Sequence, residues 1–349
     1  MRNTPGEQLI DDAQLGLGAA ERPGERPDAA AVSRRPAELL DRSTLERLSR
    51  RTNVHGLAYF LGHYALIGLG GWLCWMTFPG PLFWPAFAFQ AVVTGFLFSP
   101  LHECAHGAAF RSRWMNESVL WITALVYVVP PYYFRYFHLG HHRFTQVPGK
   151  DPSLVLPEPA TFGQYLWYCA GLWFWWRNLS WMVKHACGFL HPAGALYVPA
   201  GRRGLMVLES RIMVVLYAAL FASAAHFEFA WVLLVAWIAP RVAGEPIQRI
   251  IRVAEHVGCD ESPDLLRNIR TTLTNRFVNA IAWQMPYHAE HHLFPNVPFH
   301  ALPAVHALVG DRVVVEPRGY LAGQRQIIRM LLESVPAARA GGTTESPLL

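Results

Sequence analysis

The chain has 349 residues and a formal net charge of +5, and 52% of its residues are hydrophobic while 16% are charged. This charged content lies below the roughly 25% of soluble domains, and the apolar content excludes a largely disordered chain. Five cysteines without a Cys-x-x-Cys pair exclude a disulfide-stapled scaffold or a zinc ribbon, and the scattered arginines do not form the basic face that binds nucleic acid.

The two ends of the chain are polar. Residues 1–35 are rich in Pro, Gly, Ala and charge, lack the apolar segment of a secretory signal peptide, and are expected to be a disordered tail. Residues 36–51 are predicted to form an amphipathic helix in which Ser43 and Glu46 have capping-box spacing. Residues 335–349 are expected to be a flexible tail. A single membrane domain is therefore predicted over residues 36–334.

Four segments are apolar enough to cross a membrane. From residue 52 to residue 102 there is no Asp, Glu, Lys or Arg, which is room for two helices of ~20 residues with a turn at residues 79–81. A second apolar pair is separated by residues 226–228. We therefore predict spans at about residues 57–78, 82–101, 208–226 and 228–244.

Two further apolar segments are expected to be interfacial helices. Residues 119–130 are too short to cross unaided. Residues 165–181 combine Arg177 with five tryptophans, a mixture typical of membrane interfaces.

The placement of Lys and Arg predicts the orientation. The turns at residues 79–81 and 226–228 contain neither, whereas arginines flank the opposite ends of the spans. Because positive residues favour the cytoplasmic side, we expect both termini there, in a bacterial inner membrane. An even number of crossings then separates the histidine clusters described next, so all of them are expected in one cytoplasmic cap.

Three histidine clusters stand out among the 16 histidines. The first has two histidines four residues apart, and the other two share the spacing His-x-x-His-His. Residues three and four apart share a helix face, so each cluster can direct several imidazoles to one region. His256, in a segment where Pro246 suits the first turn of a helix, is a further candidate. The predicted metal ligands are His102, His106, His138, His141, His142, His256, His288, His291 and His292.

The number of histidines indicates more than one metal. An ion takes about four to six ligands, and imidazole suits Fe, Zn, Cu and Ni. Nine histidines therefore fit two ions. Glu103, Glu255 and Glu290 each adjoin a proposed ligand and are candidates to orient an imidazole through a hydrogen bond.

Two other interpretations explain fewer of these histidines. Residues 102–106 match the His-Glu-x-x-His fingerprint of zinc peptidases, but an intramembrane protease of that kind generally needs a further Asp ligand in a separate span. No Asp lies in a proposed span, and seven clustered histidines stay unexplained. A carrier with bis-histidine haems would need paired histidines inside the bilayer rather than clusters at its surface.

At these residues the sequence resembles the membrane fatty acid desaturase and hydroxylase superfamily, whose histidine boxes follow HxxxH, HxxHH and HxxHH. The strings HECAHG, RVAEH and MPYHAEHHLFP are most similar to compact bacterial members, and the resemblance covers roughly residues 50–310. It implies an all-α integral membrane protein with four transmembrane helices, interfacial helices and a cytoplasmic cap that holds a histidine-ligated di-iron site. Some animal members place an Asn where this chain has Arg252, so that detail of the iron site does not carry over.

The resemblance also implies an activity. Two irons with O2 as co-substrate would remove two hydrogens from neighbouring carbons of a fatty acyl chain. The alternatives are oxidative decarboxylation of a free fatty acid to a terminal alkene, and hydroxylation or ketolation of a lipid or carotenoid. No catalytic residue is assigned beyond the metal centre. Arg177, Lys184, Arg202 and Arg203 are candidates to bind a headgroup, although the positive-inside bias explains them equally well.

The electrons are expected to come from another protein. The chain has no GxGxxG after a strand, no cysteine cluster and no cytochrome-like module. A ferredoxin, rubredoxin or cytochrome b5-like donor with its reductase is therefore expected as a partner, together with membrane lipids and the lipid substrate.

Overall fold

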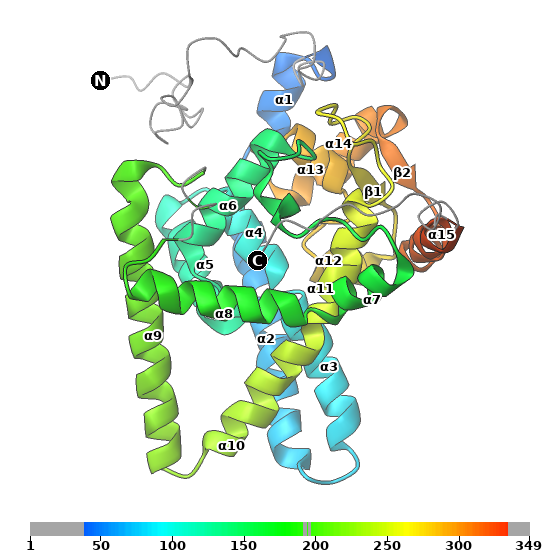
Figure 1. Ribbon diagram of the computed structural model, residues 1–349. Coiled ribbons are helices and arrows are strands. Elements are labelled where there is room, and N and C mark those ends of the chain that lie inside the picture. The colour runs from blue at the N-terminus through cyan, green and yellow to red at the C-terminus, as the bar shows by residue number, and fades with distance from the viewer. Residues whose placement is uncertain (1–37, 191–193, 195–196, 334–349) are drawn as a thin grey trace, which may run out of the picture.

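The computed structural model describes residues 38–190, 194 and 197–333. The tails expected at residues 1–35 and 335–349 lie outside the described residues. The described chain is almost entirely helical, with one pair of short strands (Figure 1).

Four helices are long and apolar enough to cross a membrane, as predicted. The second span continues from α3 into α4, and the fourth runs from α10 through a π-helical turn at Leu234–Ile238 into α11. The spans and their component helices are Asn53–Thr77 (α2), Phe83–Ala105 (α3, Phe83–Gly95; α4, Phe98–Ala105), Ala200–His226 (α9, Arg203–His226) and Ala230–His256 (α10, Ala230–Leu233; α11, Ala239–His256).

The end of the fourth span differs from the sequence prediction. The helix continues past residue 244 to His256, and Pro246 lies inside α11 rather than in the first turn of a new helix. A proline inside a helix removes one backbone hydrogen bond, but close packing of α11 against α3 holds this helix together. Gly244 and Gly95 meet at that contact, where a side chain on Gly244 would collide with the carbonyl of Ala91.

The segment between the second and third spans and the segment after the fourth span form a cap at one end of the bundle (Figure 1). In that view α7 (Phe162–Ala170) and α8 (Leu172–Ala186) lie across the ends of the spans, in the part of the chain where we expect an interfacial segment. Gly171, with φ of 72°, separates the two helices, and a side chain there would meet Glu245 of α11. The left-handed turn therefore lets α7 and α8 approach the fourth span closely.

The remaining elements build the cap around one large hydrophobic core. Leu101, Leu120, Leu293 and Leu302 belong to this core and come from four different helices. The strands pair in parallel, with Thr271 opposite Val315. The elements are α5 (Arg113–Tyr127), α6 (Pro131–Phe144), β1 (Arg270–Thr272), α12 (Arg276–Ile281), α13 (His288–Leu293), α14 (Leu302–Val309), β2 (Val314–Glu316) and α15 (Tyr320–Glu333).

The first described helix, α1, is shorter than predicted and begins differently. It spans Arg42–Leu48, and the carboxylate of Asp41 accepts a hydrogen bond from the Thr44 amide at 2.9 Å. The predicted capping residue Ser43 instead donates its hydroxyl proton to Asp41 at 2.5 Å. The capping box was therefore wrong, because Asp41 is a better acceptor for the free amides of the first turn.

Candidate metal centre

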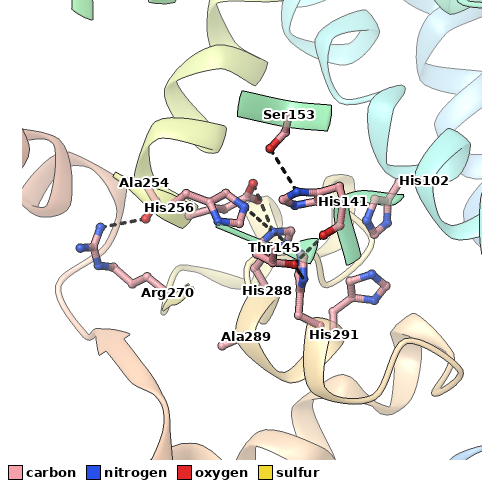
Figure 2. Close-up of polar contacts among 12 residues, drawn as sticks. His102, His141, Thr145, Ser153, Ala254, His256, Arg270, His288, Ala289 and His291 are labelled. Atoms are coloured by element: carbon pink, nitrogen blue, oxygen red, sulfur yellow. Dashed lines mark hydrogen bonds and ion pairs between the residues drawn. The ribbon is translucent and has the colours of Figure 1, made fainter. Parts of the chain in front are cut away.

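The nine predicted histidines come together from four helices. His102 and His106 lie on α4 and at its end, three histidines lie on α6, His256 ends α11, and three lie on α13. Figure 2 shows His102, His141, His256, His288 and His291 gathered in one region. Except for the half-buried His142, all nine are buried.

The imidazoles divide into two groups. Within each group, the potential ligand nitrogens all lie within 4.8 Å of one another. Successive residues of a helix point about 100° apart, so the neighbours His141 and His142 of α6 serve different groups. The first group is His102, His106, His138, His142 and His291, and the second is His141, His256, His288 and His292.

The spacing of the nitrogens fits metal coordination. The Nε2 atom of His106 lies 2.8 Å from that of His138 and 3.2 Å from that of His291. In the second group the Nε2 atom of His288 lies 3.3 Å from that of His256 and 3.1 Å from that of His292. With bonds of about 2.1 Å, as for zinc and imidazole, neighbouring ligands of one ion lie about 3 Å apart. Each group thus matches the ligand shell of one ion.

Burial favours the neutral, metal-binding form of six of these imidazoles. Burial, followed by the charge of Arg135, lowers the pKa of His106 to about 3. Burial and then neighbouring histidines lower the pKa of His138, His142, His288, His291 and His292. Both ring nitrogens of His102 are buried without a hydrogen-bond partner among the described residues. Because buried polar atoms are normally satisfied, these free nitrogens support coordination of an ion.

Asp151 is a site residue that the sequence analysis missed. Both of its carboxylate oxygens lie 3.0 Å from Nδ1 of His141, and they also accept hydrogen bonds from the amides of Gln146 and Ser153. Although burial opposes ionisation, His141 and these donors lower the pKa of Asp151. The ionised carboxylate holds a proton on Nδ1 of His141 and leaves Nε2 for a metal. The only signal in the sequence was an acid ten residues after a predicted ligand.

The three glutamates expected beside the ligands lie in different places. The Oε1 atom of Glu103 lies 3.7 Å from Nδ1 of both His102 and His291, and its other oxygen accepts from the Phe299 amide at 3.2 Å. Glu103 thus lies on the Nδ1 side of two imidazoles of the first group. The Oε2 atom of Glu255 lies 3.6 Å from Nε2 of His288, so this carboxylate lies on the side of the ring that faces the second group.

Glu290 differs from expectation. Its carboxylate accepts hydrogen bonds from Nδ1 of His306, at 2.5 Å, and from the hydroxyl of Thr271. Among the described residues its hydrogen-bond partners do not include any of the nine histidines, because it points to another side of α13. Glu290 connects α13 to α14 and β1, so it positions the helix rather than one ring.

Polar groups from neighbouring loops and strands fix the elements that carry the histidines. The Thr145 hydroxyl donates to the His141 carbonyl at 2.7 Å and lies 3.2 Å from Nδ1 of His292. Arg270 donates to the carbonyls of Ala254 and Val257 at 2.9 and 3.3 Å, which secures the end of α11 beside His256 (Figure 2). Thr145 and His292 are 147 positions apart in the chain. The spacing of residues in the sequence therefore does not reveal this contact.

Two cavities adjoin the histidines. The smaller, about 10 Å³, is lined by His102 of the first group, His288 of the second group and Glu255. The larger, about 80 Å³, has mainly aromatic walls and is lined by Arg177, Arg249 and Arg252. Phe98 lines both. Of the four predicted headgroup residues, Arg177 lines the larger cavity, whereas Lys184, Arg202 and Arg203 are exposed elsewhere.

Comparisons with known proteins identify the family of this chain. The model of the family described as fatty acid desaturase matches residues 79–314. The chain is 27% identical over 239 residues to the human sphingolipid delta(4)-desaturase/C4-monooxygenase DES2, covering 66% of each chain. It is 23% identical over 275 residues to the sn-1 acyl-lipid omega-3 desaturase (ferredoxin) of Synechocystis, covering 71% of this chain and 73% of the relative. It is 27% identical over 263 residues to the delta(12)-acyl-lipid-desaturase of Punica granatum, covering 66% and 67%. The chain thus spans about two thirds of the length of these relatives.

Proposed function

The chain belongs to the fatty acid desaturase family, and we propose on that basis that it is an O2-dependent di-iron oxidoreductase that desaturates a fatty acyl chain. The convergence of nine imidazoles into a group of five and a group of four carries this proposal. At family level the chain is a membrane desaturase-like oxidoreductase of lipid metabolism. The specific reaction, the substrate and the iron are parts of the proposal.

The balance of atoms and electrons in desaturation determines which co-reactants must be supplied. Removing two hydrogens from a –CH2–CH2– unit leaves –CH=CH–, and reducing one O2 to two waters also consumes two electrons and two protons. Two irons, when bound, supply the activation of O2 and the removal of hydrogen from an unactivated carbon. His102, His106, His138, His142 and His291 would hold one iron, and His141, His256, His288 and His292 the other.

The surrounding residues hold these ligands in the productive form. Asp151 keeps the proton of His141 on Nδ1, and Glu103 lies behind His102 and His291. Because the site is buried, bulk water is kept from the reacting carbon, which limits competing reactions. We also propose that the membrane domain extends from residue 36 to residue 334.

The lipid nature of the substrate has support in the membrane part of the structure. An apolar groove of about 640 Å³ lies among the spans, and Trp72, Trp75 and Trp237 line it. Such a groove suits an acyl chain that enters from the bilayer. Leu125 and Val126 of α5 belong to its lining, and the next residue, Tyr127, lines the aromatic cavity.

The electron donor is proposed to be a small external redox protein. The name of the Synechocystis relative includes ferredoxin, which favours a ferredoxin for this chain, with a rubredoxin or a cytochrome b5-like protein as the alternatives. We also propose that both termini and the metal site face the cytoplasm, in a bacterial inner membrane, because arginines flank the cap side of the spans.

The zinc peptidase interpretation has less support from the geometry. In such an enzyme the glutamate of His-Glu-x-x-His must activate a water. Glu103 instead lies behind the rings of His102 and His291 and accepts the Phe299 amide. It is therefore placed to orient ligands rather than to act on a substrate.

One experiment separates the possible products. The full-length chain would be expressed in a lipid-producing host, and lipids, free acids and headspace gases would be analysed by mass spectrometry. A new internal alkene is the expected result. A volatile terminal alkene would instead show oxidative decarboxylation, an alcohol or ketone would show oxygen insertion, and an unchanged lipid profile despite bound iron and a supplied ferredoxin system would refute the proposed function.

A further inference from the structure

The aromatic cavity beside the metal centre contains more positive charge than the residues around it neutralise. Of its three arginines, Arg249 is paired, because it donates to Glu245 at 2.5 Å. Glu245 is also shared with Arg241, which donates to it at 2.7 Å. One carboxylate therefore already serves two guanidinium groups and has little capacity left for others.

Arg177 and Arg252 have no such partner. In the part of the chain that the structure describes, no carboxylate lies within 4.0 Å of either guanidinium, and Glu158, an acid close to Arg252, bonds to Gln146 instead. Arg177 is fixed over the rings of Phe137 and Trp181, with its guanidinium carbon 5.7 and 5.1 Å from the ring centroids. An arginine stays protonated in proteins, so the cavity holds two cations without a carboxylate in direct contact. Glu158 and Glu255 are near enough to interact with the charge of Arg252, but neither forms an ion pair with it.

This pair lies close to the histidines. Arg252 is four residues, about one helical turn, before His256 on α11. Ser153 lines the same cavity, and its hydroxyl oxygen lies 3.1 Å from Nδ1 of His141. Phe98, whose ring centroid is 5.6 Å from that of His102, separates this cavity from the smaller one at the histidines. An anion bound at Arg252 would therefore lie beside the second group, with Phe98 between the cavity and His102 of the first group.

The chemistry of the cavity favours a carboxylate with an apolar chain. Guanidinium forks match the two oxygens of a carboxylate, while Phe134, Phe137 and Trp181 provide apolar walls for the carbons attached to it. The cavity, of about 80 Å³, has room for a small headgroup. Electrostatic attraction is strong in such a partly buried place, because little water screens it.

We propose that Arg177 and Arg252 bind the free carboxylate of an amphiphilic acid substrate, so that the carbons nearest the carboxylate lie closest to the metal centre. This inference rests on the proposed function and specifies its substrate class. It assigns Arg177 and Arg252 to substrate binding, and it places the oxidised carbons near the acid end of the chain.

The test measures binding rather than turnover. The iron-loaded full-length protein in nanodiscs would be titrated with dodecanoate, methyl dodecanoate, dodecanol and dodecyl phosphate, and Kd would be measured by calorimetry. The wild-type protein is expected to bind dodecanoate at least tenfold more tightly than the ester or the alcohol. Equal affinity for acid and ester, or tighter binding of the phosphate, would overturn the carboxylate assignment.

Variants test which residues cause the preference for the acid over the ester. R177Q and R252Q are each expected to reduce the preference for acid over ester at least tenfold, while R177K retains an intermediate preference because it keeps the charge but loses the fork. R276Q, which removes an exposed arginine at the start of α12, is the matched control and should leave the preference unchanged. If R177Q and R252Q fold and bind iron but keep the full preference for the acid, the assignment of carboxylate binding to Arg177 and Arg252 is wrong. If they fail to fold, the wild-type comparison of acid with ester still decides.

The results distinguish failure of the carboxylate site from failure of the proposed function. Selective binding of dodecanoate without any oxidation product would leave the carboxylate site standing while the proposed function fails. Oxidation of an esterified chain with no preference for the free acid would refute the site while the proposed function stands.

Discussion

Nδ1 of His141 lies 3.0 Å from each carboxylate oxygen of Asp151, and the carboxylate is itself held by the amides of Gln146 and Ser153. This contact fixes the ring of one proposed ligand from the side opposite the metal. Carboxylates that support a metal-bound histidine in this way commonly contribute 10–100-fold to metal affinity or activity.

Replacing this carboxylate should weaken the second metal group. D151N is expected to lower the iron affinity of that group about 10–100-fold, because the amide no longer stabilises the required tautomer of His141. Iron per chain would be measured by elemental analysis after dialysis against a weak chelator. D311N, at an exposed acid outside the site, is the control, and equal iron in the two variants would contradict the proposed role of Asp151.

Removing single imidazoles should abolish the activity. H102A, H141A, H256A and H291A are each expected to lose turnover and to bind less iron, because two of these residues belong to each metal group. Product formation and iron content would be measured on the same preparations. H226A, at the exposed end of α9, should behave as the wild-type protein. Full activity in two of the four variants would refute the ligand set.

The metal-free protein should become less stable on acidification. Burial lowers the pKa of His106 to about 3 and lowers that of His138, His142, His288, His291 and His292. Below about pH 6.5 the unfolded histidines take up protons that the folded ones do not, so the free energy of unfolding falls with pH, by up to about 1.4 kcal/mol per pH unit and histidine. Tm measured between pH 7.5 and 5.5 should drop steeply, and a Tm that rises on acidification would contradict neutral imidazoles.

The crossing of α3 and α11 should be intolerant of added volume. G244A places a methyl group against the Ala91 carbonyl and is expected to destabilise the protein by about 1–3 kcal/mol, and to lower bound iron because α11 carries His256. G62A is the matched control, because a methyl group there meets nothing within 4 Å in helix α2, and it should be neutral or stabilising. Equal Tm and iron in the two variants would show that the close approach of the helices is unimportant.

The orientation can be tested with a native cysteine. Of the described free cysteines, Cys187 at the end of α8 is exposed on the cap side. If the cap is cytoplasmic, a membrane-impermeant maleimide should label Cys187 in inside-out vesicles and not in intact spheroplasts. A C187S/F227C variant, with its cysteine in the turn after α9, should show the opposite pattern. Labelling of Cys187 in spheroplasts would place the cap outside.

The local features of this protein could be predicted from the sequence. The absence of charge from residue 52 to residue 102 predicts two of the four spans, because hydropathy and length decide whether a helix crosses a membrane. The spacing within each histidine cluster predicts that its rings share a face, because helix geometry is local. The sequence thereby specified the class of protein and the residues to examine.

The tertiary structure decided which of these residues act together. The division into groups of five and four depends on how α4, α6, α11 and α13 cross, and Pro246 stays inside α11 because of packing against α3. Asp151 reaches His141, Glu290 turns away to His306, and Arg177 and Arg252 line one cavity. Local periodicity specifies the direction of a side chain along its own helix, but a neighbour across space is set by the packing of segments that the sequence places far apart.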